Sequence, residues 1–280
     1  MRAGEGSVVI GCADFLGNGA MRADQLLVRR GLAASRTAAQ RLIEAGRVRF
    51  EQAGHGGRTW QTVAKASLDL PEGTPLELLP DPDDRYVSRG GRKLAGALAH
   101  TGLAVAGRTC LDLGQSTGGF TDCLLQAGAA RVIGVEVGHG QLHPRLRADA
   151  RVVCLEGVNA RHLSAASLGP HRPVEGFDLI VADLSFISLT LILPRLPPLL
   201  APSGRMFLLV KPQFELGPQA LGKGGIVRDS RLYDTAKAKL HQACTASGLV
   251  PMDWFPSPIT GTDGNREFFL YGRLSKPPAG

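Results

Sequence analysis

The chain has 280 residues, of which 44% are hydrophobic and 20% are charged. This composition excludes a disordered protein and allows one large domain with a buried core plus a small one. The net charge of +7 favours a polyanionic partner such as nucleic acid, because lysine and arginine release counterions when they bind phosphates. No membrane span is expected, since the most apolar region, residues 179–201, is interrupted by charges and prolines.

The five cysteines are widely spaced and form no CxxC pair. An odd number at such spacing argues against a disulfide framework and against a zinc site. We therefore expect a cytoplasmic protein without a bound metal.

The chain begins with a glycine-rich, weakly patterned stretch, and we predict that residues 1–20 form a disordered extension. Two short helices follow, one capped by Asp24 and the other by Ser35, whose side chains can accept a hydrogen bond from the first turn. Strand-like runs come next, at residues 47–51, 60–63 and 76–79. We predict a small α+β domain over residues 21–80.

After a polar linker at residues 81–87, short apolar runs alternate with amphipathic or turn segments. Such alternation is typical of α/β domains with a mostly parallel sheet covered by helices. We predict strands at residues 108–113, 130–135, 152–156, 179–183 and 206–210. A last pair of runs, 250–255 and 268–274, predicts an antiparallel strand that closes the sheet. This second domain spans residues 88–275.

A glycine-rich turn, residues 112–120, follows the first of these strands. Its glycines permit positive φ angles, and the amides of the next helix can hold an anionic group. The second strand ends near Glu136, where an acid commonly bonds the ribose of an adenosine cofactor in a doubly wound sheet. The run has neither the Walker A pattern nor the G-x-G-x-x-G spacing, so these residues alone allow either an adenosine cofactor or a dinucleotide.

Four charged residues stand near the start of a helix or at the ends of predicted strands: Lys93, Asp183, Lys211 and Glu267. Taken singly, each fits a surface lysine, a strand-end aspartate or a salt-bridge glutamate. Together on one predicted edge of the sheet, they favour a catalytic set.

These segments occur in the order seen in a known family. Residues 86–273 resemble the FtsJ-like ribose methyltransferases, and the run 35–46 (S-R-x-x-A-x-x-L-I-x-x-G) resembles the RNA-binding domain named after ribosomal protein S4. The chain as a whole resembles the TlyA family of ribosomal RNA 2′-O-methyltransferases. The matching segments are residues 86–94, 112–124, 183–188, 210–215, 222–225 and 257–268.

The resemblance implies a Rossmann-like methyltransferase sheet, S-adenosylmethionine as cofactor and ribosomal RNA or a ribosomal subunit as partner, with cytidine as the modified nucleotide. It implies that the methionine part is surrounded by Asp112, Gly114, Ser116 and Gly118, the ribose bound by Glu136, and the adenine adjoined by Asn159. Gln115, Glu136 and Asn159 differ from the residues common in relatives, without removing a required chemical function.

Methyl transfer to a ribose 2′-hydroxyl depends on alignment, which can contribute roughly 7–11 kcal/mol, and on removal of the hydroxyl proton. A lysine can take that proton only as a neutral amine, a form that burial or a second cation favours. We expect Lys211 to be the base and Lys93 to favour its neutral form. Asp183 would orient Lys211, and Glu267 would complete the hydrogen bonding of both lysines.

Basic residues of both domains are candidates for contacts with RNA phosphates, which position RNA without reading its sequence. In the first domain these are Arg29, Arg30, Arg36, Arg41 and Arg47. In the second domain they are Arg89, Arg92, Lys223, Arg228 and Arg266, with Lys223 in a loop able to close over substrate.

Three alternative functions compete with this interpretation. A non-catalytic RNA-binding assembly factor would be expected to show a broken catalytic set. A haemolysin-like membrane-lytic protein is disfavoured by the lack of an apolar span. A DNA or protein methyltransferase is disfavoured because residues 183–186 do not form the Pro-Pro-Tyr arrangement used with flipped bases.

Overall fold

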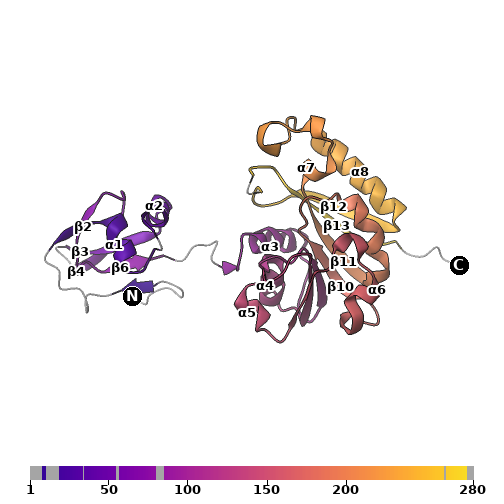
Figure 1. The fold of residues 1–280 in the computed structure, drawn as a ribbon, viewed down its shortest axis with the longest axis horizontal. Helices are drawn as coiled ribbons and strands as arrows, with labels where there is room; N and C mark the ends of the chain where they lie inside the picture. Colours follow the sequence, from indigo (N-terminus) through magenta and orange to yellow (C-terminus); the bar gives the residue numbers. More distant parts are fainter. Residues whose placement is uncertain are drawn as a thin grey trace. The chain divides into compact units, whose positions relative to one another are not determined.

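The computed structural model describes residues 8–10, 19–33, 35–54, 57–79, 85–261 and 263–275. The chain divides into two compact units, Met1–Arg85 and Tyr86–Gly280 (Figure 1). Within the described ranges, no helix combines the length and the apolar character needed to cross a membrane.

The first unit packs two helices, α1 (Ala23–Arg29) and α2 (Arg36–Glu44), against short antiparallel strands. A four-stranded sheet has the order β1 (Val8–Ile10), β6 (Leu76–Leu78), β3 (Val48–Gly54) and β4 (Gly57–Thr62), and β2 (Ala20–Arg22) pairs with β5 (Asp69–Pro71). Leu26, Ile43 and Leu76 lie in the shared core. The predicted small α+β unit is therefore present.

Of the two predicted helix caps, the structure confirms one and contradicts the other. Ser35 caps α2 as predicted. Asp24 does not cap α1, because Arg22 stands at that position and the Asp24 side chain is fully buried. Hydrogen bonding from Arg22, with further bonds from Arg36 and Gln40, holds the pKa of Asp24 well below its usual range. Asp24 thus ties the two helices together.

Part of the predicted disordered extension is a strand. Val8–Ile10 form β1 and pair antiparallel with β6, with Val9 opposite Glu77. This departs from the prediction for residues 1–20, because the β-branched run Val-Val-Ile suits the unpaired edge that β6 would otherwise expose. Residues 1–7 and 11–18, and residues 81–84 of the predicted linker, lie outside the described residues.

Arg30 is buried, although we expected it to contact RNA. Its guanidinium donates one hydrogen bond to the carbonyl oxygen of Thr74, at 2.6 Å, and another to the carbonyl oxygen of Glu72. These carbonyls belong to the turn between β5 and β6. The prediction of a phosphate contact was therefore wrong: Arg30 holds this turn to the end of α1.

We predict that Arg30→Ala destabilises the first unit by about 1–3 kcal/mol, because it leaves buried carbonyl oxygens without donors. Arg41→Ala, which shortens an exposed side chain on α2, should change the free energy of unfolding by no more than about 0.5 kcal/mol. The chain has two tryptophans, Trp60 in the first unit and Trp254 in the second. Fluorescence-detected unfolding in a Trp254→Phe background therefore reports on the first unit. Equal midpoints for the two variants would contradict the prediction.

The second unit is built on a seven-stranded sheet in the order β12-β13-β11-β10-β7-β8-β9. The strands are β7 (Thr109–Leu113), β8 (Arg131–Glu136), β9 (Val152–Glu156), β10 (Phe177–Ala182), β11 (Leu200–Val210), β12 (Leu249–Pro256) and β13 (Phe268–Leu274). β13 runs antiparallel to both of its neighbours, and the other pairs are parallel. The predicted Rossmann-like α/β sheet is confirmed.

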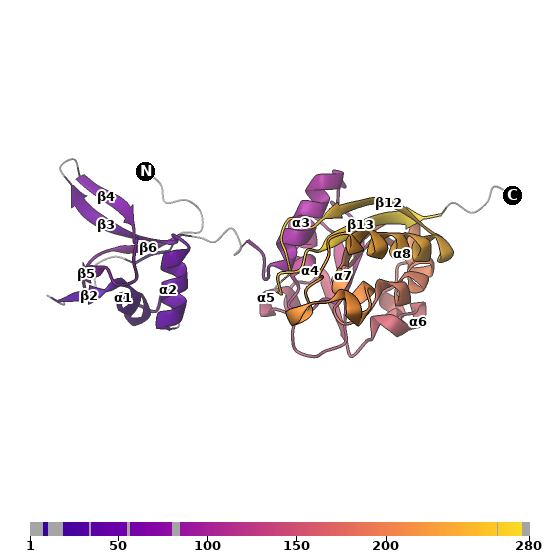
Figure 2. The ribbon, with the colours of Figure 1, turned by 90° about the horizontal axis from the view of Figure 1, so that it is seen from above.

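Helices cover both faces of this sheet (Figures 1 and 2). One face carries α3 (Gly90–Thr101), α4 (Gly119–Gln126) and α5 (Pro144–Arg147), and the other carries α6 (Ala165–Leu168) and α8 (Leu232–Ala246). In β10, Leu179 and Val181 face the first group and Ile180 faces the second. Strands buried on both faces carry unbroken apolar runs, which is why they could be predicted.

Short helical turns complete the second unit. They are α7 (Pro212–Glu215) and the 3₁₀ turns Ala160–His162, Gly169–His171, Leu189–Leu191, Leu193–Arg195, Pro197–Leu199, Pro218–Ala220 and Lys223–Gly225.

The strand order reverses between β7 and β10. The chain runs outward from β7 through β8 to β9, and then returns to β10 and β11. In open sheets of this kind, ligands bind outside the carboxyl ends of the strands at the reversal. Asp183 and Lys211 directly follow β10 and β11, and Glu267 directly precedes the antiparallel β13. All three residues therefore lie at this edge.

Asp112, expected beside the cofactor, is fully buried in β7 behind the glycine-rich turn. Its Oδ2 accepts a hydrogen bond from Thr121 Oγ1 at 2.7 Å, and Thr121 accepts one from Gln115. Within the described residues its Oδ1 has no hydrogen-bond partner. Burial raises the pKa of Asp112 from an ordinary value of 3.8 to about 7. Asp112 braces the turn from inside the fold.

We predict that Asp112→Asn stabilises the protein at about pH 8 and has little effect near pH 4. Because the folded pKa is raised to about 7, the wild-type free energy of unfolding falls as pH rises through the window from 3.8 to about 7. The slope approaches about 1.4 kcal/mol per pH unit, and asparagine, which does not ionise, escapes this loss. Urea unfolding at several pH values measures the difference. A pH-independent difference between variant and wild type would contradict this origin.

Candidate active site

Four charged side chains form an alternating row at the carboxyl edge of the sheet. Lys211 Nζ lies 2.6 Å from Asp183 Oδ1, and Lys93 Nζ lies 4.0 Å from Asp183 Oδ2. Lys93 Nζ in turn lies 2.6 Å from Glu267 Oε2. The structure therefore brings together the four residues predicted to form a catalytic set. They come from the first turn of α3, the ends of β10 and β11, and the start of β13.

Glu267 forms the buried end of this row, with its side chain 3% exposed. Burial raises the pKa of Glu267, and the ion pair with Lys93 opposes that shift. The pairing therefore offsets the desolvation of both groups and holds Lys93 in place.

The segment after β10 brings a hydroxyl group to the row. Lys211 Nζ donates a hydrogen bond to Ser185 Oγ at 2.7 Å. The far end of the segment is held by Glu215, a buried residue of α7, which accepts hydrogen bonds from Ser188 Oγ at 2.6 Å and from the amide of Leu189 at 2.7 Å. The segment is therefore anchored at both ends.

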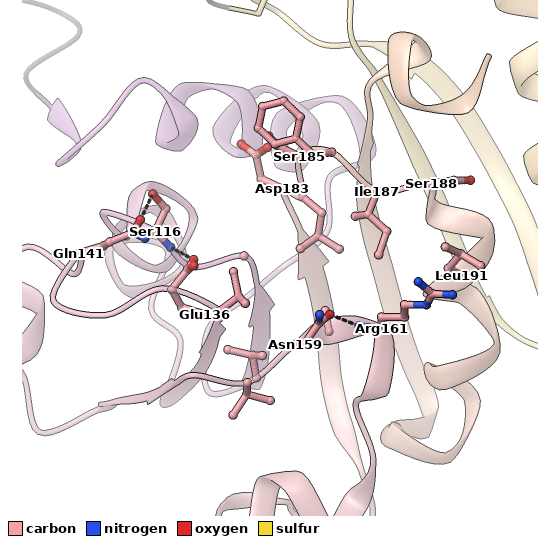
Figure 3. Close-up of a pocket in the computed structure, with 17 residues that line it drawn as sticks. Ser116, Glu136, Gln141, Asn159, Arg161, Asp183, Ser185, Ile187, Ser188 and Leu191 are labelled. Carbon is pink, nitrogen blue, oxygen red and sulfur yellow. Dashed lines mark hydrogen bonds between the residues drawn. The ribbon is translucent and has the colours of Figure 1, made fainter. Parts of the chain in front are cut away.

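A cavity of about 690 Å³ lies beside the row, within the range of roughly 300–1,000 Å³ usual for small-molecule sites. Figure 3 shows it enclosed by the turn after β7, the end of β8 and the segment after β10. Four of the predicted cofactor residues line it: Gly114, Ser116, Glu136 and Asn159. Gly118 does not, and neither does Asp112. At Gly118 a Cβ atom would meet Leu146 at 2.3 Å, so this glycine permits close packing of the turn.

Glu136 is presented to the cavity by two backbone amides. Its Oε2 accepts a hydrogen bond from the amide of Ser116 at 2.9 Å, and its Oε1 accepts one from the amide of Gly138 at 2.8 Å. A carboxylate offers about four acceptor positions, so both oxygens can still accept from the two hydroxyls of a ribose. The site therefore fits an adenosine group.

Part of the cavity lining is apolar and suits a flat ring, with Val135, Val158 and Leu191 among the apolar residues. Asn159 Oδ1 accepts a hydrogen bond from the amide of Arg161 at 2.9 Å and so caps the turn that begins there. Both residues line the same end of the cavity (Figure 3).

The turn after β7 passes very close to the row of charges. Gly114 has a φ of 80°, and a Cβ atom on it would lie 2.7 Å from the carbonyl oxygen of Asp183. Only glycine combines this dihedral with so close an approach. The turn and the row are therefore fixed against each other.

Two smaller cavities adjoin the first. One, of about 210 Å³, is lined by Ser88, Gly119, Asp183 and Lys211 among others, and it shares Gly114 and Ser116 with the large cavity. The other, of about 530 Å³, is lined by Lys93, Lys211 and Glu267 and by two phenylalanines.

The two phenylalanines, Phe186 and Phe214, were not singled out from the sequence. Their ring centroids lie 5.2 Å apart, and Phe186 is 91% exposed with a φ of 63°. An exposed aromatic residue in this strained conformation is uncommon and points to a functional role. A signal was present, because each phenylalanine stands three residues after Asp183 or Lys211.

The predicted RNA contacts of the second unit differ in their exposure to solvent. Lys223 is exposed, and the loop that carries it is tied to Asn265, whose Nδ2 donates to the carbonyl oxygen of Gly225 at 3.0 Å. Arg89 is exposed and donates to the carbonyl oxygen of Thr260. The exposed set also includes Arg228 and Arg266, whereas Arg92 is half-buried.

In the first unit, three predicted RNA contacts already have protein partners. Arg29 pairs with Glu72, Arg36 with Asp24, and Arg47 donates to the carbonyl oxygen of Leu79; their side chains are partly accessible. Arg41 is exposed on α2. Among the residues that the structure describes, no group of three or more metal-binding side chains is placed to hold a metal ion.

Comparison with known proteins agrees with this geometry. The model of the FtsJ-like methyltransferase family matches residues 86–274, and the S4 domain model matches residues 21–50. TlyA of Mycobacterium tuberculosis, named a 16S/23S rRNA (cytidine-2′-O)-methyltransferase, is 43% identical over 252 residues, which cover 90% of this chain and 89% of that protein.

Two further relatives extend the comparison. Hemolysin A of Brachyspira hyodysenteriae is 35% identical over 90% of this chain and 99% of that protein. A solved structure from Streptococcus thermophilus is 37% identical, with a TM-score of 0.67 over 94% of this chain and 91% of that one. With an S4 domain, an FtsJ-like domain and this identity over nearly its whole length, the chain belongs to the TlyA family of methyltransferases.

Proposed function

We propose that this protein transfers a methyl group from S-adenosylmethionine to the ribose 2′-hydroxyl of a cytidine in ribosomal RNA. The observation that carries the proposal is the row of Lys211, Asp183, Lys93 and Glu267, which lies where a cavity fit for adenosine meets one walled by aromatic rings. The name of the Mycobacterium tuberculosis relative supports the substrate, and the S4 domain supports RNA binding. Ribosomal RNA as substrate implies a cytoplasmic site of action.

The large cavity and its smaller neighbour are the proposed cofactor site. S-adenosylmethionine supplies an electrophilic methyl group when bound. Glu136 would hold the ribose hydroxyls, and the apolar part of the lining would receive the adenine. Gly114 and Ser116 would adjoin the methionine part, where the carboxylate of Asp183 favours a positively charged sulfonium.

Within the row, each group has a distinct task. Lys211 Nζ takes the proton of the ribose hydroxyl, and Asp183, 2.6 Å away, holds Lys211 at the junction of the cavities. Lys93 shares the Asp183 carboxylate with Lys211, which places a second amino group beside the base. Glu267, whose Oε2 lies 2.6 Å from Lys93 Nζ, holds Lys93 in place.

The third cavity is the proposed site of the target nucleotide. Phe186 and Phe214 line it together with both lysines of the row. An exposed aromatic face can stack on a base, which contributes about 1–3 kcal/mol per base. The base would then lie beside the group that activates its ribose.

We predict that Lys211→Ala lowers methyl transfer from labelled S-adenosylmethionine to isolated ribosomal subunits by at least about 100-fold, as expected for loss of a general base. Lys211→Arg is the matched control: it keeps a positive charge beside Asp183 but cannot accept a proton, so it should be equally inactive. Label in alkali-resistant dinucleotides would locate the methyl group on a 2′-oxygen. Activity retained in Lys211→Arg would exclude Lys211 as the base.

The same assay separates the alternative functions. Cofactor binding without labelling of either subunit or of naked ribosomal RNA would reject the enzyme and favour a non-catalytic assembly factor. Label recovered on a base, on DNA or on protein would favour another class of methyltransferase. The haemolysin-like alternative, suggested by the name of one relative, predicts lysis of red cells by the purified protein.

We predict that Glu136→Ala weakens binding of S-adenosylhomocysteine by about 10- to 100-fold, the usual range for loss of hydrogen bonds to a charged group. Glu156→Ala is the control, because Glu156 ends the neighbouring strand β9, pairs with Arg147 and lines none of the three cavities. Calorimetric titration measures both affinities. Equal affinities for the two variants would show that Glu136 does not hold the ribose.

A further inference from the structure

Ser185 occupies a position that no other described residue shares: it lines all three cavities at the edge of the sheet. It follows Asp183 by two residues in the segment after β10, and it is exposed. Its Oγ accepts a hydrogen bond from Lys211 Nζ at 2.7 Å. Within the described part of the chain, this is the one hydrogen bond of the Ser185 side chain. Ser185 was given no role from the sequence.

We propose that Ser185 is a positioning residue that directs the lone pair of neutral Lys211 toward the ribose hydroxyl. This inference rests on the proposed function, in which Lys211 is the base. Ser185 lies outside the row of four charges. Two properties of the base are involved: where Lys211 Nζ lies, and which way its lone pair points.

The place of Lys211 is set by Asp183. Nζ lies 2.6 Å from Asp183 Oδ1, but this oxygen has no partner with the geometry of a hydrogen bond in the described structure. The charge of Asp183 holds the nitrogen nearby and favours an N–H bond over the lone pair on that side, but this attraction is less directional than a hydrogen bond. Ser185 provides the directed bond.

The direction follows from the valence of the nitrogen. A neutral amine has two N–H bonds and one lone pair around Nζ. One N–H bond points at Ser185 Oγ, and the negative charge of Asp183 attracts the second and repels the lone pair. The lone pair is then left facing away from both oxygens. Without Ser185, rotation about the Cε–Nζ bond would exchange the lone pair with an N–H bond.

The distance between Ser185 and Lys211 is fixed by a single short element. Lys211 immediately precedes α7, and Glu215 at the end of α7 binds Ser188 and Leu189 in the segment that carries Ser185. The base and its acceptor are therefore braced by the same turn. Since Ser185 is exposed, its hydroxyl can be removed without creating a buried cavity.

The test compares Ser185→Ala, Ser185→Thr and Thr190→Val in the full chain. Thr190→Val is the matched control, because it removes a hydroxyl from the same segment, one that bonds Ser188 and lines none of the three cavities. The measurements are the single-turnover rate on ribosomal subunits at saturating S-adenosylmethionine, and the dissociation constants for S-adenosylhomocysteine and for the subunits.

We expect Ser185→Ala to lower the single-turnover rate by roughly 10- to 100-fold, the usual loss when a reacting group is misaligned, with both dissociation constants within about twofold of wild type. Ser185→Thr restores the acceptor and should recover most of the rate, and Thr190→Val should keep it.

Any of five results would overturn the inference. A wild-type rate in Ser185→Ala would show that the hydroxyl has no role. A faster rate would show that Ser185 donates to the lone pair and blocks it. A loss explained by weaker cofactor binding, or an equal loss in Thr190→Val, would reduce Ser185 to a structural residue. A wild-type protein that methylates no ribosomal RNA would reject the proposed function and this inference with it.

Discussion

The position of the Asp183 carboxylate between two lysines is the constraint on which the site depends. Two ammonium groups at a partly buried edge repel each other, and an acid between them removes that cost only when the charges alternate in space. The alternating order Lys211, Asp183, Lys93 and Glu267 meets this condition. The direction of β13 makes this order possible. Because β13 runs antiparallel to β11, its first residues lie at the edge where β10 and β11 end.

The same aspartate fixes the cofactor cavity to the row. Asp183 lines the large cavity and the smallest one, and its carbonyl oxygen lies where a side chain on Gly114 would have to be. The turn after β7 can therefore neither shift nor accept a larger residue without moving the charges. Alignment of the reacting groups is thus a consequence of how two neighbouring strands end.

The sheet and the charged residues at its edge could be predicted from the sequence, because they depend on apolar runs and on where strands end. The role of a residue such as Arg30 could not, because it depends on contacts with distant parts of the chain. Strands buried on both faces carry unbroken apolar runs, so the sheet and the charges at its edge were accessible to prediction. Arg30 was misjudged because its partners are backbone carbonyls more than forty residues away, which leave no pattern. Asp112 lies within a strand, and its position in the sequence does not show whether the side chain faces the cavity or the core, where the structure buries it. Phe186 was missed because it has a positive φ that an aromatic residue rarely adopts, and Ser185 because its hydrogen bond comes from Lys211, 26 residues further along the chain.

The segment after β10 contributes several groups to the site, and contacts at both of its ends hold it in place. Holding Phe186 at a φ of 63° with its ring exposed costs about 1–3 kcal/mol, so the neighbouring contacts must impose this conformation. They do so from both sides: Lys211 binds Asp183 and Ser185 before it, and Glu215 binds Ser188 after it. Because Lys211 directly precedes α7 and Glu215 is its last residue, one short helical turn links the base, its acceptor and the segment that carries the exposed ring. A change at Glu215, far from the reacting atoms, would therefore disturb all three together.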